Sequence, residues 1–126
     1  MILVVEDEEM IRMVVEEALT DAGFEIVSVS TAGDAFDALS GPDRGFTGVV
    51  TDIRLGGEAS GWEIARKARE LRPQMAIVYV SGDSGGEWAV MGVPGSEFIQ
   101  KPFAGVQIST AVSMLLNAAS STLPTK

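Results

Sequence analysis

The centre of the chain holds the stretch Val49-Val50-Thr51-Asp52-Ile53-Arg54-Leu55, which is followed by Gly56-Gly57. Its apolar and β-branched residues are typical of a strand that is buried on both faces, as in a parallel sheet covered by helices. The carboxyl end of such a strand lies where open α/β folds bind their ligands. Asp52 is therefore expected at that end of the sheet, and its alternative role there is that of a turn former or helix cap.

The rest of the chain repeats this alternation of strand and helix. Further strands are predicted at residues 2–5, 24–29, 75–80 and 97–100. The intervening segments carry apolar residues three and four positions apart, which is the spacing of a helix with one buried face. Short connections between alternating elements predict a doubly wound parallel sheet. The residues expected to face the core include Ile11, Val14, Val15, Ala18, Leu19 and Ala22 of the first helix, Ile64, Ala65, Ala68 and Leu71 of the third, and Ile108, Ala111, Val112, Leu115, Leu116 and Ala119 of the last.

Capping residues locate the ends of the first three helices. Gly23 suits the position after the first helix, and Thr31-x-x-Asp34 has the spacing of a capped start for the second. The third is expected to open with a capping box at Ser60-Gly61-Trp62-Glu63 and to end at Pro73.

The fourth helix and the end of the chain have weaker signals. Ser84 and Glu87 have capping spacing, but Gly85-Gly86 weakens the first turn by about 1 kcal/mol per glycine relative to Ala. This helix is therefore expected to be short or irregular. Residues 120–126 are rich in Ser, Thr and Pro and are expected to form a flexible tail.

The composition limits the function. The 126 residues are 46% hydrophobic and 21% charged, as in a globular domain, without a membrane span or a signal peptide, so the cytoplasm is expected. Without cysteine there is no disulfide or thiol nucleophile, and without histidine there is no catalytic triad. With 18 acidic and 9 basic residues the net charge is −9, which disfavours nucleic acid and anionic lipid and suits a cation or a basic protein surface.

Polar side chains follow four of the five predicted strands. Glu6 and Asp7 come after the first, Asp52 after the third, Ser81 after the fourth and Lys101 after the fifth. They are expected together, because the carboxyl ends of parallel strands meet at one end of the sheet. Three carboxylates without His or Cys form an oxygen-only site that suits Mg²⁺ or Ca²⁺. A carboxylate is also a nucleophile in phosphoryl transfer, with metal, ammonium and hydroxyl groups stabilising the developing charge.

Each of these residues also has an ordinary structural explanation. The acidic run Glu6-Asp7-Glu8-Glu9 is favourable in the first turn of a helix. Ser81 suits a turn or helix cap, Lys101 a solvated surface position, and Pro102 the start of a helix. Their joint occurrence at the ends of strands favours a shared site.

Four motifs taken together are highly specific, namely Leu3-Val4-Val5-Glu6-Asp7-Glu8, Val50-Thr51-Asp52, Val80-Ser81-Gly82 and Lys101-Pro102-Phe103. On these motifs the chain resembles the receiver domain of two-component response regulators over essentially its whole length. The expected fold class is thus α/β, with a doubly wound five-stranded parallel sheet in the flavodoxin-like order 2-1-3-4-5 and five helices. A stand-alone receiver domain is expected over residues 1–119.

The resemblance implies that Asp52 is the phosphoacceptor in a phosphorelay. Asp7, helped by Glu6, would hold Mg²⁺ together with Asp52 and the backbone carbonyl of Arg54, with Mn²⁺ or Ca²⁺ as substitutes. The protein would then be a signalling phosphoacceptor rather than an enzyme.

The resemblance also assigns the switch residues. Ser81 would be the hydroxyl that turns toward the phosphate, Lys101 the ammonium that pairs with it, and Phe98 the aromatic switch residue. The Lys101–Pro102 peptide is commonly cis in such domains.

The implied phosphodonor is a histidine kinase or a histidine phosphotransfer protein, which accounts for the absence of histidine in this chain. In such receivers the donor docks beside the first helix and the loop before the last helix. The candidate residues are Met10, Ile11, Met13, Val14 and residues 103–106. A downstream protein partner is implied but not identified.

The chain departs from the family pattern near Asp52 and in the fourth helix. Arg54 lies where family members tune phosphoryl lifetime, and we hypothesise that Arg54, paired with Asp83, screens the phosphoryl group from water. The glycine-rich segment around Trp88 makes any dimer mode of relatives doubtful for this chain.

Three other functions share parts of this pattern. A small Mg²⁺-dependent phosphohydrolase with an aspartyl nucleophile usually has a second Asp two residues further on, where this chain has Arg54. A flavin mononucleotide binder needs backbone donors after its first strand, where this chain has four acids. A pseudo-receiver that works without phosphorylation is disfavoured by the complete set Asp7, Asp52, Ser81 and Lys101.

Overall fold

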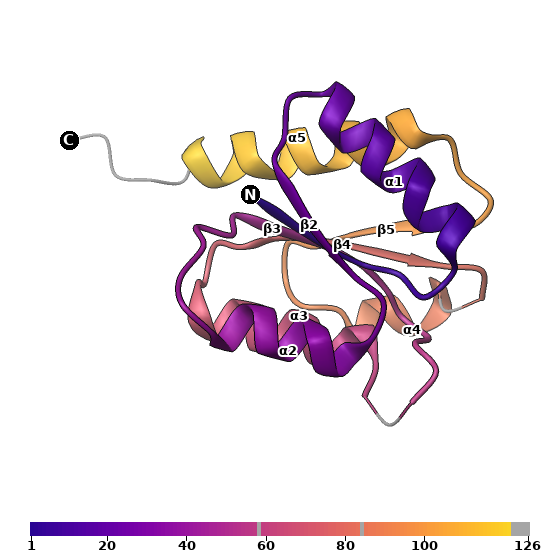
Figure 1. The fold of residues 1–126 in the computed structure, drawn as a ribbon, viewed down its shortest axis with the longest axis horizontal. Helices are drawn as coiled ribbons and strands as arrows, with labels where there is room; N and C mark the ends of the chain where they lie inside the picture. Colours follow the sequence, from indigo (N-terminus) through magenta and orange to yellow (C-terminus); the bar gives the residue numbers. More distant parts are fainter. Residues whose placement is uncertain (58, 84, 122–126) are drawn as a thin grey trace.

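Figure 1 shows the fold in a computed structural model, which describes residues 1–57, 59–83 and 85–121. Five parallel strands form one sheet in the order β2-β1-β3-β4-β5, which confirms the predicted fold class. The strands are β1 (Ile2–Val5), β2 (Ile26–Val29), β3 (Gly48–Asp52), β4 (Ala76–Ser81) and β5 (Glu97–Gln100). The helices are α1 (Glu9–Asp21), α2 (Ala32–Ser40), α3 (Gly61–Leu71), α4 (Gly85–Met91) and α5 (Gly105–Ser121).

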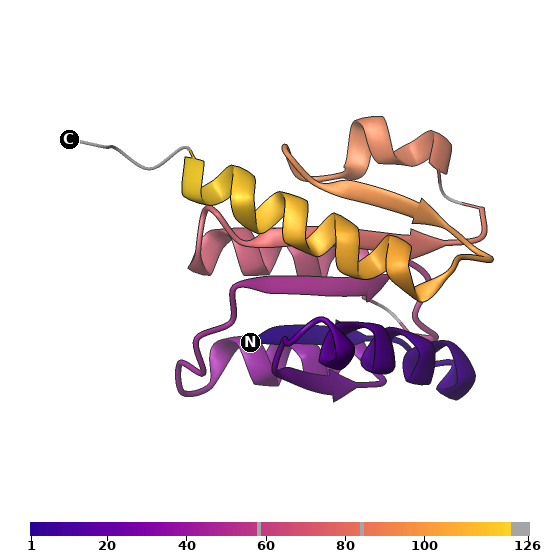
Figure 2. The ribbon, with the colours of Figure 1, turned by 90° about the horizontal axis from the view of Figure 1, so that it is seen from above.

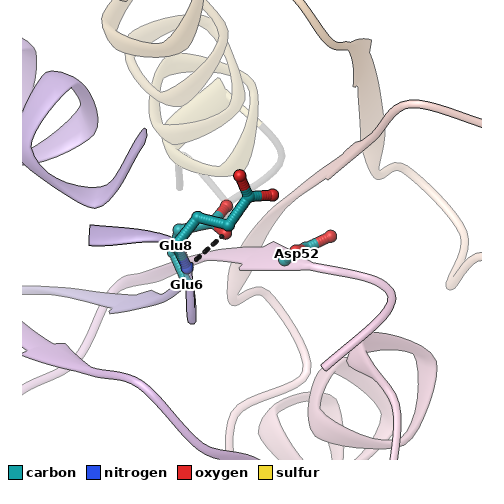
Figure 3. A group of neighbouring side chains, drawn as sticks. All are labelled: Glu6, Glu8 and Asp52. Atoms are coloured by element: carbon teal, nitrogen blue, oxygen red, sulfur yellow. Dashed lines mark hydrogen bonds between the residues drawn. The ribbon is translucent and has the colours of Figure 1, made fainter. Parts of the chain in front are cut away.

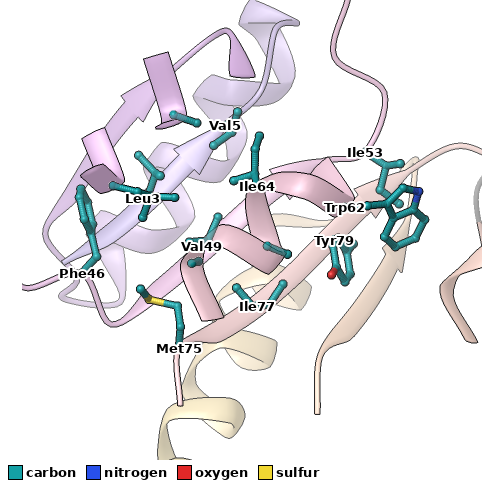
Figure 4. Close-up of a cluster of buried hydrophobic side chains, with 14 of the residues drawn as sticks. Leu3, Val5, Phe46, Val49, Ile53, Trp62, Ile64, Met75, Ile77 and Tyr79 are labelled. Atoms are coloured by element: carbon teal, nitrogen blue, oxygen red, sulfur yellow. The ribbon is translucent and has the colours of Figure 1, made fainter. Parts of the chain in front are cut away.

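The helices cover the sheet in two layers. Helices α1 and α5 lie on one face, and α2, α3 and α4 lie on the other (Figures 1 and 2). Successive residues of the inner strands face opposite layers: Leu3 and Val49 pack toward α2 and α3 (Figure 4), and Val4 and Val50 pack toward α1 and α5. Because both faces are covered, every residue of β1, β3 and β4 is buried, which explains their continuous apolar sequence.

Three expectations about buried helix faces are wrong, and the first concerns Ala22, which is exposed because it is the C-cap of α1 and lies past the last helical residue. Leu71 is 50% exposed because α3 ends there, at the C-cap Arg72. Val14 is 44% exposed because α1 packs on the sheet along Val15 and Leu19, which leaves Val14 beside the start of α5 and open to solvent.

The predicted ends of the first two helices are confirmed. Gly23 follows α1 with a φ of 95°, and the Thr31 side chain accepts a hydrogen bond of 3.1 Å from the Asp34 N–H. The second strand begins at Ile26 rather than at residue 24, because the Phe24 N–H still bonds the carbonyl of Leu19 at the end of the helix.

The capping box predicted for α3 is wrong. Ser60 occupies the N-cap position with an extended backbone, but its side chain makes no cap hydrogen bond. The Glu63 N–H, which the Ser60 side chain would cap, donates to the Ser60 carbonyl at 3.2 Å instead. The Gly61 N–H donates to the carbonyl of Ile53, the residue after β3, at 2.9 Å.

Helix α4 is short, as predicted, and has seven residues. Its predicted cap, Ser84, lies outside the described residues. Helix α5 continues to Ser121, because serine is only mildly unfavourable in a helix and Ala118 and Ala119 favour it. The rest of the tail, residues 122–126, lies outside the described residues. Within the described ranges, the helices are too short or too polar to cross a membrane.

Candidate functional site

Asp52 is the last residue of β3 and is 5% exposed. The first residue of α3, Gly61, lies against the backbone of Asp52 and Ile53, where the Cβ of any other residue would overlap the Asp52 carbonyl oxygen. The Ile53 N–H donates to the Val80 carbonyl at 3.2 Å, so that the neighbouring strand also holds this segment. The absence of a side chain at Gly61 thus permits the close contact that fixes the backbone of Asp52.

Three carboxylates meet above the carboxyl end of β1 and β3 (Figure 3). Glu6, Glu8 and Asp52 each offer one oxygen, and these oxygens all lie within 4.8 Å of one another. Glu6 is 3% exposed and Glu8 lies mostly in solvent, and a carboxylate oxygen of Glu6 accepts the Glu8 N–H at 3.1 Å. A cluster of hard oxygen ligands of this kind suits a divalent cation such as Mg²⁺.

Lys101 supplies a positive charge to all three carboxylates. Its Nζ lies 3.2 Å from Asp52 Oδ2, 3.3 Å from Glu6 Oε1 and 3.5 Å from Glu8 Oε1. The Lys101 N–H donates to the Ser81 carbonyl at 2.9 Å, which anchors the lysine beside β4, and the Lys101–Pro102 peptide is cis.

Burial and charge displace the protonation equilibria of this cluster. Burial, and then the Asp52 charge, raise the pKa of Glu6 to about 7. Burial also raises the pKa of Asp52, against the lowering effect of Lys101. Burial lowers the pKa of Lys101, but the two buried carboxylates outweigh it, and the net shift is upward. A cation bound here would stabilise the ionised carboxylates that burial penalises.

The acidic residue that joins Glu6 and Asp52 is Glu8 and not the predicted Asp7. Asp7 is exposed and lies outside the group of three oxygens. The chain bends at Asp7, and the hydrogen bond from the Glu8 N–H to the Glu6 carboxylate holds Glu8 beside the cluster. No spacing rule in the sequence indicates Glu8, because the direction of its side chain depends on this bend.

Arg54 makes the predicted ion pair with Asp83. Its Nε lies 2.8 Å from Asp83 Oδ1, and its guanidinium also reaches Glu87 of α4 at 3.6 Å. The hydrogen bond from Arg54 to Asp83 raises the pKa of the guanidinium further above its usual value. The backbone N–H of Arg54 donates to Asp52 Oδ1 at 3.3 Å, which links this residue directly to the acid.

Ser81 is buried at the end of β4 and forms a local pair with Asp83. The Ser81 hydroxyl donates to Asp83 Oδ1 at 3.2 Å and accepts the Asp83 N–H at 3.3 Å. Asp83 Oδ1 is therefore shared by the hydroxyl of Ser81 and the guanidinium of Arg54.

Phe98 lies on β5 under α4. Its ring is half-buried, with its centroid 6.2 Å from that of Trp88, and Gly85 packs closely over its edge. The Trp88 indole N–H donates to the hydroxyl of Ser96 at 3.0 Å. Phe98, the predicted aromatic switch residue, is thus in contact with α4, the helix that departs most from the family pattern.

The outer face of α1 carries large apolar side chains in solvent. Met10 is 82% exposed and Met13 is 57% exposed, and Val106 at the start of α5 is 67% exposed. These side chains line one shallow groove between the two helices. The groove lies where the sequence predicts that a donor protein docks.

The comparisons with known proteins agree with this fold. Residues 2–113 match the response regulator receiver domain family, and the chain belongs to that family. A crystal structure of a response regulator receiver protein from Sinorhizobium medicae WSM419 is 48% identical and covers 94% of both chains, with a TM-score of 0.88. NtrX from Brucella abortus is 30% identical over 95% of this chain and 27% of its own, with a TM-score of 0.80.

Two relatives are similar in sequence. The C4-dicarboxylate transport transcriptional regulatory protein DctD of Rhizobium meliloti (strain 1021) is 32% identical over 106 residues, which are 82% of this chain and 22% of DctD. The response regulator receiver protein CpdR of Brucella abortus (strain 2308) is 31% identical over 81 residues, which are 64% of this chain and 65% of CpdR. The chain therefore spans less than two thirds of the length of either relative.

Proposed function

We propose that this receiver domain accepts a phosphoryl group on Asp52 in a two-component phosphorelay and thereby switches a protein-binding face. The observation that carries the proposal is the position of the Asp52 carboxylate. It is buried at the carboxyl end of the central strand, 3.2 Å from the ammonium of Lys101 and within 4.8 Å of two further carboxylates. This is the combination of nucleophile, cation and metal ligands that phosphoryl transfer requires.

The residues at this site fit Mg²⁺. Three carboxylates face a single ammonium group, so the ionised cluster has an excess of negative charge that a divalent cation would neutralise. We propose Glu6, Glu8 and Asp52 as the carboxylates that hold it, with the backbone carbonyl of Arg54 as a further ligand from the family resemblance. Bound there, the metal would stabilise charge that develops on the phosphoryl oxygens.

Phosphoryl transfer to Asp52 forms one bond to phosphorus and breaks another. A carboxylate oxygen of Asp52 attacks the phosphorus of a phosphohistidine on the donor and forms a P–O bond. The P–N bond breaks, and its electron pair stays with the imidazole, which takes up a proton. Lys101 pairs with the charge of the transferred group, and Ser81 turns its hydroxyl toward that group.

The switch that we propose begins at Ser81 and Phe98. Phosphorylation draws the Ser81 hydroxyl and the Phe98 ring inward, and the surface around α4 and β5 repacks, because two conformations are in equilibrium and the new charge favours one. A downstream protein that prefers this conformation would then bind. The donor, a histidine kinase or a histidine phosphotransfer protein, is proposed to dock on the apolar groove between α1 and α5.

Intact mass spectrometry tests the phosphoacceptor. The protein is incubated with Mg²⁺ and acetyl phosphate, in parallel with the Asp52→Asn variant. We expect a gain of one phosphoryl group that is absent in the variant and in the presence of EDTA. A gain that persists in the variant would show that another residue accepts the phosphate. Steady release of phosphate over many turnovers would favour the phosphohydrolase, and no gain with either acetyl phosphate or a phosphorylated donor would favour the pseudo-receiver.

A titration with Mg²⁺ tests the metal ligands. Because a Glu8 oxygen lies within 4.8 Å of oxygens of Glu6 and Asp52 while Asp7 is exposed, Glu8→Gln is expected to weaken Mg²⁺ binding more than Asp7→Asn, as measured by tryptophan fluorescence or calorimetry. Glu9→Gln, a charge change in the same acidic run, is the control. The reverse order would return Asp7 to the role that the family resemblance implies.

A further inference from the structure

Two groups beside the phosphoacceptor are engaged by another acid. The guanidinium of Arg54 and the hydroxyl of Ser81 both bond the same oxygen, Asp83 Oδ1, at 2.8 and 3.2 Å. Both groups are donors, and both lie next to Asp52: Arg54 through its backbone N–H, and Ser81 at the end of the adjacent strand. Asp83 Oδ1 therefore accepts hydrogen bonds from the two donors that could otherwise bind an oxygen of a phosphoryl group on Asp52.

A second acid extends this arrangement to α4. Glu87, in the first turn of the helix, places a carboxylate oxygen 3.6 Å from the Arg54 guanidinium. Arg54 thus connects the loop after β3 to the start of α4. Through Asp83, the same guanidinium is connected to Ser81.

Helix α4 has few other contacts that would hold it in place. None of its seven residues is buried, and Val90 is 84% exposed. Besides the ion pair of Glu87, its described contacts with the body of the domain include the tilted ring contact of Trp88 with Phe98, the hydrogen bond of Trp88 to Ser96, and the packing of Trp88 and Met91 at the edge of the hydrophobic core. The ion pair of Glu87 therefore links the first turn of α4 directly to Arg54, the residue whose backbone N–H bonds Asp52.

We propose that Asp83 and Glu87 form an internal substitute for the phosphoryl group. In the unphosphorylated protein these two carboxylates occupy the Arg54 guanidinium, and Asp83 also occupies the Ser81 hydroxyl. Phosphorylation of Asp52 displaces them, which frees Asp83 from Ser81 and Glu87 from Arg54 and releases the start of α4. This inference rests on the proposed phosphorylation of Asp52 and specifies how it reaches the helix.

The relative strength of the interactions favours this exchange. The side chains of Arg54, Asp83 and Glu87 are 63%, 64% and 55% exposed, and ion pairs this exposed are weak and screened by salt. A phosphoryl group carries about two negative charges and several acceptor oxygens, so it competes effectively with single carboxylates for arginine and hydroxyl donors. Asp83 is in this scheme a positioning residue that sets the resting direction of Ser81.

Hydrogen–deuterium exchange of the full chain tests the inference. The probe for the phosphorylated state is beryllium fluoride with Mg²⁺, and the readout is the exchange of the α4 amides. In the wild type we expect faster exchange of α4 on addition of the probe. In Glu87→Gln we expect α4 to exchange roughly two- to fivefold faster without the probe, the range set by the loss of one exposed ion pair, and to change little when the probe is added.

Two further variants separate this role from general destabilisation. Asp83→Asn keeps the shape of the side chain and is expected to lower the half-saturating concentration of beryllium fluoride roughly two- to fivefold at low salt, with a smaller effect at high salt. Asp43→Asn is the control, because it breaks an equally exposed ion pair, with Arg72 at 3.9 Å, on the other end of the sheet. It should leave α4 exchange and probe affinity at wild-type values.

The inference is overturned if α4 exchange in Glu87→Gln equals that of the wild type, or if Asp83→Asn binds the probe no better. These results leave the proposed function intact when the wild type still gains a phosphoryl group by mass. A wild type that neither gains that mass nor binds beryllium fluoride refutes the proposed function, and with it the displacement by phosphate.

Discussion

Helices α3 and α4 lie on the same face of the sheet and both begin beside the acidic site, but they are held there differently. Helix α3 buries five of its residues, and its first residue packs against the backbone of Asp52. Helix α4 buries none, and its first turn is tied to the site by the exposed ion pair of Glu87 with Arg54. The contrast is between a firmly packed helix that supports the backbone of Asp52 and a helix that is held mainly by exposed or half-buried side chains.

The two tryptophans give the largest expected difference between the helices. Trp62 of α3 is 5% exposed and its ring lies 4.7 Å from that of Tyr79, so that Trp62→Ala is expected to cost about 3–5 kcal/mol of unfolding free energy. Trp88→Ala removes a half-buried ring and one hydrogen bond and is expected to cost about 1–2 kcal/mol. Urea denaturation measures both, and equal losses would contradict the contrast.

The pH dependence of the unfolding free energy tests how strongly burial destabilises the ionised form of Glu6. Burial and Asp52 raise the pKa of Glu6 from 4.5 to about 7 in the folded protein, so its protonated form stabilises the fold. That contribution, up to about 3 kcal/mol, is complete below pH 4.5 and is lost as the pH rises through 7. In EDTA, the unfolding free energy of Glu6→Gln should therefore fall less than that of the wild type between pH 5 and pH 8. Parallel profiles would contradict the raised pKa.

Two glycine substitutions sharpen the comparison. Gly61→Ala places a Cβ against the Asp52 carbonyl and is expected to cost about 2–3 kcal/mol and to lower the yield of phosphorylation. Gly86→Ala, where a Cβ meets no atom within 4 Å, is expected to stabilise the protein by up to about 1 kcal/mol. Thermal denaturation of the two variants tests this, because the melting temperature should fall for Gly61→Ala and rise for Gly86→Ala.

The smallest expected effect is on phosphoryl lifetime. If Arg54 screens the phosphoryl group from water, Arg54→Ala should shorten the lifetime of phosphorylated Asp52 by roughly two- to fivefold, because one exposed charge interaction is lost. The loss of the added mass with time measures it. Arg72→Ala, which breaks the exposed pair with Asp43, is the matched control. An unchanged rate in Arg54→Ala would disprove the hypothesis.

The sequence was most informative where burial is complete. The apolar runs of β1, β3 and β4 are buried on both faces and predict the sheet, and the parallel topology then brings Glu6, Asp52, Ser81 and Lys101 to one end. The directions of side chains in the turns after the strands were not predictable from the pattern. Glu8 rather than Asp7 joins the cluster, because the chain bends at Asp7, the Glu8 N–H bonds the Glu6 carboxylate and the Glu8 side chain reaches Lys101.

Local rules also failed where tertiary contacts replaced them. The Ser60 side chain makes no cap, because the Glu63 N–H donates to the Ser60 carbonyl instead. The Gly61 N–H donates to the carbonyl of Ile53, and this contact follows from the fold rather than from the residues around Ser60. The sequence predicts the pair of Arg54 and Asp83, but not the hydrogen bond from Ser81 to the same carboxylate oxygen. Spacing along the chain does not show that two donors 27 residues apart converge on one oxygen.

The exposed methionines of α1 make the apolar groove sensitive to oxidants. Conversion of a thioether to a sulfoxide turns an apolar side chain into a polar one. Met10, at 82% exposure, and Met13, at 57%, should react with peroxide well before Met75, which is 3% exposed in the core. Mild oxidation would then make this groove polar while the fold stays intact, and methionine sulfoxide reductase would reverse the change.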